Sequence, residues 1–72
     1  MNHFSKDAFA ANLRAERARL DISQEELAER SGVSTAAIIS YENGAYVLGA
    51  DKVCAIAEVL GVTPNDLCGW GR

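Results

Sequence analysis

Residues 23–44, SQEELAERSGVSTAAIISYENG, contain two helix starts and two helix stops in close succession. Residues 23–26, SQEE, have the form of a capping box, in which the serine oxygen accepts from the backbone N–H three residues on and the glutamate reaches back to the N–H of the serine. Ser31-Gly32 ends the helix that begins there, because glycine tolerates the left-handed conformation. Ser34 then caps a second helix, which stops at Asn43-Gly44. The stretch therefore predicts two short helices joined by a tight turn.

The apolar residues of the same stretch fit two helices that cross closely. Ala28 is small enough for a close crossing, and Gly32 supplies the turn. Four larger side chains can attach both helices to a shared core: Leu27, Val33, Ile38 and Tyr41. The pattern predicts a helix-turn-helix over about residues 23–44, whose second helix is free to project into the major groove of DNA.

The rest of the chain predicts three more helices. Helical spacing places three residues on one side of a helix over about residues 6–20: Phe9, Leu13 and Leu20. A later helix that ends at Gly61 shows the spacing i, i+3, i+4 and i+7: Val53, Ile56, Ala57 and Leu60. Thr63-Pro64 starts a last helix, with threonine as the N-cap. We therefore predict an all-α fold of five helices in a single domain over residues 1–72.

Composition and charge narrow the possible functions. The chain has 72 residues, of which 49% are apolar and 24% charged. A chain this short buries only roughly 60% of the surface that its unfolded form exposes, which excludes a large catalytic cleft. Its formal net charge of −3 has the wrong overall sign for a nonspecific binder of polyanions. Five of the seven basic residues lie between Lys6 and Arg30, so we expect any basic face to come from the N-terminal half.

No pattern in the sequence indicates catalysis, metal binding or a membrane. The apolar runs are too short to span a bilayer, and the N-terminus lacks the order of a signal peptide, so we expect a cytoplasmic protein in which Cys54 and Cys68 are thiols. The cysteines lack the paired spacing of zinc sites, and His3 lies in the N-terminal segment. We expect no catalytic residue, metal ion, cofactor or small-molecule substrate.

The chain resembles the phage repressor and Cro-type (XRE-like) helix-turn-helix family. Five blocks occur in the family's order and at its spacing: LRAER (13–17), SQEELA (23–28), SGVS (31–34), I-x-x-Y-E-N-G (38–44) and IAEVLGVTPNDL (56–67). The resemblance implies a compact lambda-repressor-like DNA-binding domain and a sequence-specific transcriptional regulator, which most often acts as a repressor.

The resemblance also implies which residues contact DNA. Gln24 and the turn at Asn43-Gly44 match positions that contact phosphate, and a glutamine amide at a helix N-terminus is suited to hold an anion. The N-terminal part of the recognition helix supplies the remaining candidates: Ser34, Thr35, Ala36, Ala37, Ile39 and Ser40. None of these is the arginine, glutamine or asparagine that reads guanine or adenine best. Base reading would therefore use hydroxyl groups and apolar contacts with thymine methyl groups.

Two further roles follow from the resemblance and from surplus apolar residues. Arg17 and Glu42 match a pair that forms a partly buried salt bridge in related domains, and we expect its role to be structural. A thin core leaves several apolar residues for the interface of a homodimer on a pseudo-palindromic operator: Tyr46, Val47, Leu48, Leu67 and Trp70.

One alternative function stays open at this point. The acidic net charge and the weak set of base-reading residues also fit a protein-interaction module, such as an antitoxin or an adaptor, that keeps the helix-turn-helix fold without binding DNA.

Overall fold

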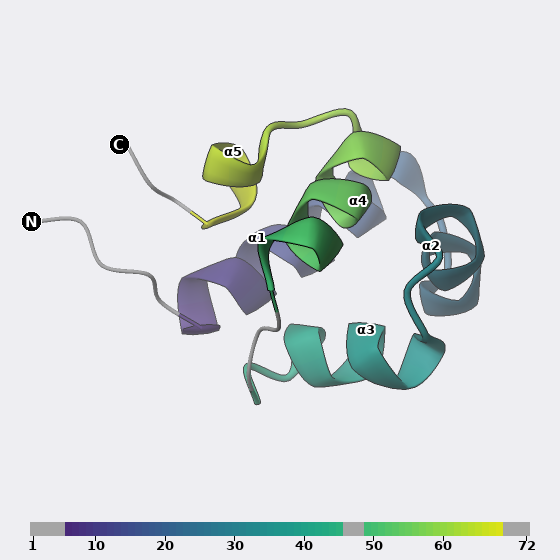
Figure 1. Cartoon of the computed structure of the whole chain (residues 1–72), viewed down its shortest axis with the longest axis horizontal. Coiled ribbons are helices and arrows are strands. Elements are labelled where there is room, and N and C mark those ends of the chain that lie inside the picture. Colours follow the sequence, from purple (N-terminus) through teal and green to yellow (C-terminus); the bar gives the residue numbers. More distant parts are fainter. Residues whose placement is uncertain (1–5, 46–48, 69–72) are drawn as a thin grey trace, which may run out of the picture.

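The structure is a computed structural model that describes residues 6–45 and 49–68 and contains five helices (Figure 1). In chain order they are α1 (Lys6–Leu20), α2 (Gln24–Ser31), α3 (Thr35–Glu42), α4 (Ala50–Leu60) and α5 (Pro64–Cys68). No strand occurs in these two described ranges. No helix within them is both long enough and apolar enough to cross a bilayer. The predicted all-α class and the order of the helices are confirmed.

The ends of α2 and α3 form as their cap residues predict. Ser23 Oγ accepts from the N–H of Glu26 at 2.9 Å, and Ser34 Oγ accepts from the N–H of Ala37 at 3.1 Å. Gly32 has a φ of 75° and donates its N–H to a carbonyl in the last turn of α2. A residue without a Cβ adopts this conformation without strain, so Gly32 fixes the turn between the two helices.

The reciprocal half of the capping box lies elsewhere than the sequence predicts. The carboxylate of Glu26 pairs with Arg30, one turn further along α2, instead of reaching back to Ser23. A reciprocal box forms at α5, where Thr63 Oγ1 accepts from the N–H of Asp66 and Asp66 Oδ2 accepts from the N–H of Thr63, both at 3.1 Å. The short last helix therefore has two capped N–H groups at its start.

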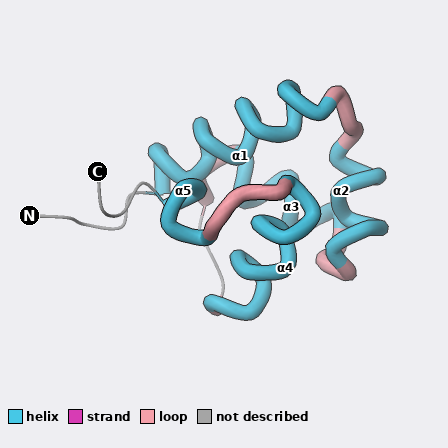
Figure 2. Tube along the Cα trace, turned by 90° about the horizontal axis from the view of Figure 1, so that it is seen from above, coloured by secondary structure: helices cyan, strands magenta, loops and turns pink. Residues whose placement is uncertain are grey.

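All five helices contribute to one core. Helix α1 packs against α3, α4 and α5, whereas α2 packs against α3 and α4. Figure 2 shows α2 at one end of α1 and α5 near the other. The rings of Phe9 and Tyr41 meet edge to face with their centroids 6.0 Å apart, which joins α1 to α3. The largest fully buried side chains are Phe9, Leu13, Leu27, Ile38, Tyr41, Ile56, Leu60 and Leu67.

Two leucines lie differently from prediction. Leu20, expected on the inner side of the first helix, is the last residue of α1 and is 36% exposed. Leu67, expected to face a second copy of the chain, is 0% exposed, because α5 packs it against α1 and α4. Leu67 is therefore a core residue and has no surface to offer a partner.

Helix α1 also closes the C-terminal ends of three other helices. Asn12 Nδ2 donates to the carbonyl of Leu67 in α5 at 2.8 Å. Arg19 Nη2 donates to the last carbonyl of α4 at 3.0 Å, and Arg14 donates to the last carbonyl of α3. The final carbonyls of a helix have no partner within it, and cations are favoured at this end of the helix dipole. Side chains of α1 thus donate hydrogen bonds to carbonyls at the C-terminal ends of three helices.

Candidate nucleic-acid interface

One face of α3 is fixed in the core and the opposite face is open to solvent. Ile38, Tyr41 and Glu42 are buried, which turns Ala36 and Ile39 outward. Ile39 is 40% exposed, although large apolar side chains are favoured inside a protein. Along the lower edge of the molecule in Figure 1, α3 lies with α2 at its N-terminal end. The outward face is small, neutral and partly apolar.

Three of the predicted base-reading residues lie on the sides of α3 and are half-buried. They are Thr35, Ala37 and Ser40. Ala37 packs against the core, so it offers less surface than the sequence predicts. Ser34 is exposed, but its oxygen already accepts a hydrogen bond from the helix it caps. The hydroxyl groups of Thr35 and Ser40 are therefore the polar groups nearest the outward face.

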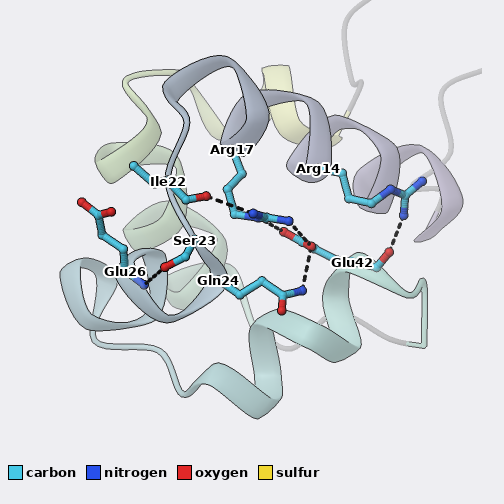
Figure 3. A network of polar contacts seen from close by, with 7 residues as sticks. All are labelled: Arg14, Arg17, Ile22, Ser23, Gln24, Glu26 and Glu42. Atoms are coloured by element: carbon cyan, nitrogen blue, oxygen red, sulfur yellow. Dashed lines mark hydrogen bonds and ion pairs between the residues drawn. The ribbon is translucent and has the colours of Figure 1, made fainter.

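The C-terminal end of α3 is held by a buried carboxylate. Glu42 is 4% exposed and accepts from Arg17 Nε at 2.6 Å and Arg17 Nη2 at 3.0 Å, as a two-pronged ion pair. Arg17 Nη1 also donates to the carbonyl of Ile22 at 2.9 Å. Figure 3 shows these groups between α1, the α1–α2 turn and α3. The predicted pair of Arg17 and Glu42 is present in the structure.

The chemistry of this pair makes it a rigid joint. The hydrogen bond to Glu42 raises the pKa of Arg17, which further favours the charged guanidinium. Removing one partner from a buried pair leaves an uncompensated charge, which costs more than the intact pair contributes. The pair joins α1 to the C-terminal end of α3, and its role in fixing the tilt of α3 stays a prediction.

Gln24 is a third member of this network. Its Nε2 donates to Glu42 Oε1 at 3.0 Å, which joins the first residue of α2 to the last residue of α3. The family resemblance assigns Gln24 only to a contact with DNA phosphate. The phosphate contact stays a prediction, and the structure adds a contact within the protein that no local sequence pattern indicates.

The turn after α3 uses its backbone donors internally. The N–H groups of Asn43, Gly44 and Ala45 donate to carbonyls of α3, the last two at 3.2 and 3.1 Å. Gly44 has a φ of 73°, a conformation that glycine adopts without strain. In this arrangement the exposed side chain of Asn43 is left to make the phosphate contact that the sequence predicts for this turn.

The expectation of a basic face in the N-terminal half needs correction. Its four arginines each bond to groups of the protein itself: Arg14, Arg17 and Arg19 as described above, and Arg30 with Glu26. Lys52 of α4, which takes part in none of the ion pairs among the described residues, lines a depression with Ala36 and Ser40 of α3. Sequence reasoning missed it, because its spacing from α3 is set by tertiary packing and not by a local motif.

The other predicted roles concern metal ligands, the two cysteines and a dimer interface. Within the described residues no group of three or more histidine, cysteine or acidic side chains could hold a metal ion. Burial raises the pKa of the Cys68 thiol, whereas Cys54 is exposed. The remaining residues predicted at a dimer interface lie outside the described part of the chain: Tyr46, Val47, Leu48 and Trp70.

Comparison with known proteins identifies the family. A sequence-family model described as helix-turn-helix matches residues 13–67. The restriction-modification controller protein C.AhdI from Aeromonas hydrophila has a similar crystal structure, with a TM-score of 0.81 and 27% identity over 86% of this chain and 94% of that chain. The clp gene regulator ClgR from C. glutamicum is similar with a TM-score of 0.77 and 29% identity over 86% of this chain and 80% of that chain. No curated protein matches the sequence significantly. Because the family match spans most of the chain, including α2, the turn and α3, the protein belongs to the helix-turn-helix family.

Proposed function

We propose that the protein is a DNA-binding transcriptional regulator that places α3 in the major groove of an operator. The observation that carries this proposal is the contrast between the two faces of α3, one locked by Ile38, Tyr41 and Glu42 and the other open. The major groove, about 12 Å wide, admits such a helix. The names of the two similar proteins, a restriction-modification controller and a gene regulator, support a role in transcription.

Recognition by α3 would rest on hydroxyl and apolar contacts. Thr35 and Ser40 offer hydroxyl groups that bond to several base edges, and Ile39 and Ala36 offer apolar surface to thymine methyl groups. Such contacts discriminate less between bases than a bidentate arginine or glutamine does. Specificity would then require more than one copy of α3.

A homodimer on a pseudo-palindromic operator supplies the second copy. A two-fold dimer presents its recognition helices about 34 Å apart, one turn of DNA, and sums two weak half-sites. Occupancy of an operator that overlaps a promoter represses transcription by blocking polymerase in the cytoplasm. Sedimentation tests this assembly: a monomer at tens of micromolar, with or without a palindromic operator, rules it out.

Fluorescence anisotropy tests the function itself. The probes are a duplex from upstream of the protein's own coding sequence and a scrambled duplex of the same length, titrated over a series of salt concentrations. A preference for the upstream duplex is expected. Equal weak binding to both, or none, supports the alternative of a protein-interaction module.

A matched pair of variants assigns the binding surface. Ala36 on α3 and Ala15 on α1 are both exposed helical alanines, so replacing either with aspartate adds the same charge. Ala36→Asp should abolish binding, because it places a negative charge in the major groove between the two phosphate strands, while Ala15→Asp should leave binding close to that of the wild type. Equal effects of the two variants would contradict the placement of α3 in the groove.

A further inference from the structure

Lys52 lies beside the recognition helix on the side that faces α4. It lines a shallow depression together with Ser34, Ala36, Ala37 and Ser40. The residues that α3 contributes are all small, so they leave room for a ligand next to the lysine. Because Ala36 is on the outward face, the depression continues the surface that meets DNA in the proposed function.

The other described cations near the helix-turn-helix have partners within the protein. The ion pairs among the described residues use Arg17, Arg19 and Arg30, and Arg14 donates to the end of α3. None of these pairs involves Lys52. A lysine ammonium is a compact charge on a flexible stem, which suits contact with a phosphate oxygen.

The depression that Lys52 lines has an acidic neighbour, with which it shares Gly32, Val33 and Ser34. A second open depression at the N-terminal end of α3 is lined by Thr35 together with Glu25 and Glu29 of α2, both of which are exposed. A helix seated in the major groove has one strand's phosphates on each side of it. Glu25 and Glu29 repel phosphates near that depression, whereas Lys52 attracts them.

On these grounds we infer that Lys52 anchors one sugar-phosphate strand beside α3 and is the principal phosphate-binding cation of the described domain. This inference rests on the proposed function, since it assumes that α3 occupies the major groove. It goes beyond that function by naming a contact from α4, outside the helix-turn-helix.

The test uses three variants of the full chain. Lys52→Met removes the charge but keeps much of the stem, and Lys52→Arg restores the charge. Arg30→Met is the matched control, because it makes the same change in net charge at a residue paired with Glu26. Each variant is titrated with the upstream and the scrambled duplex by anisotropy over a salt series, and its thermal unfolding is checked by circular dichroism.

Loss of one phosphate contact lowers the slope of log affinity against log salt by about 0.9, which is roughly an eightfold loss of affinity at about 0.1 M salt. We expect this loss for Lys52→Met on both duplexes, with their ratio unchanged, and recovery in Lys52→Arg. Arg30→Met should keep the wild-type slope.

Two outcomes would overturn the inference while the proposed function stands. A wild-type slope in Lys52→Met shows that the lysine contacts no phosphate, and an equal loss in Arg30→Met shows a general effect of net charge. A change in the ratio between the two duplexes would assign Lys52 to base reading instead, and would also overturn the inference. Failure of the wild-type protein to bind either duplex is distinct, because it refutes the proposed function itself.

Discussion

Helices α1 and α3 differ in the charged side chains that they carry and in where those side chains bond. Three arginines lie on α1, and all three donate to groups of the protein itself, whereas α3 carries no basic residue and turns a small neutral face outward. The arginines of α1 are therefore used within the protein, while the outward face of α3 carries no charged side chain. The difference teaches that the charge pattern of a sequence need not mark its DNA-binding surface, because arginines also cap helices and pair with buried carboxylates.

The largest effect is expected from breaking the ion pair that joins α1 to α3. Arg17→Met leaves the carboxylate of Glu42, 4% exposed, without its ion-pair partner and should destabilise the protein by about 3 kcal/mol in urea denaturation. Glu42→Met should cost less, because the Arg17 side chain is 24% exposed and water can solvate it. The double variant should lie well below the sum of the two losses. Small additive losses would show that the pair is not a structural joint.

A second test separates contacts that position the protein from contacts that read bases. Thr35→Ala should cost about 1 kcal/mol at the preferred operator and little on scrambled DNA, because it removes a hydroxyl beside the outward face. Gln24→Ala should weaken binding to both duplexes equally and lower stability by about 1 kcal/mol, because its bond to Glu42 is lost. Equal loss of selectivity in both variants would contradict this assignment.

A third test compares two helix caps made by α1. Arg14→Met and Arg19→Met each remove a cation from the C-terminal end of a helix and should each cost roughly 0.5 kcal/mol of stability. Of the two variants, only Arg14→Met should weaken DNA binding, since Arg14 caps α3 while Arg19 caps α4. Thermal unfolding and anisotropy measured on both variants check the prediction. If binding falls equally in the two, the end of α3 has no special role.

The smallest expected effect concerns the acidic depression at the N-terminal end of α3. Glu29→Gln removes a repulsive charge from the depression beside Thr35 and should raise affinity about twofold, as expected for unit charges roughly 10 Å apart in water. Glu58→Gln, an exposed change of the same kind on α4, is the control. The gain should vanish at high salt, because screening removes the repulsion. The same gain in the control would indicate only the effect of net charge.

Local signals made most of the fold predictable. Four residues act at helix ends through their own backbone neighbours, so their patterns can be read directly from the sequence: Ser23, Gly32, Ser34 and Thr63. The pair of Arg17 and Glu42 was predictable for another reason, since it rests on the resemblance to a family. Both kinds of prediction agree with the structure, except that Glu26 pairs with Arg30 instead of completing the capping box.

The contacts that escaped prediction depend on the packing of distant segments. Gln24 meets Glu42 only after α2 and α3 cross, and Lys52 approaches α3 only after the chain returns through α4. The small core expected of a short chain predicts that Leu67 faces a partner, yet α5 brings it against α1. Neither the periodicity of apolar residues nor the spacing of a motif predicts which distant segments pack together.

The capping of three helix ends by α1 bears on how the domain opens. Asn12, Arg14 and Arg19 release the last carbonyls of α5, α3 and α4 together if α1 detaches, and the core loses Phe9 and Leu13 in the same step. Opening of α1 should therefore be indistinguishable from global unfolding. In native-state hydrogen exchange, the protected amides of α3 and α4 should share one free energy of opening with those of α1, so the domain has no smaller unit that unfolds on its own.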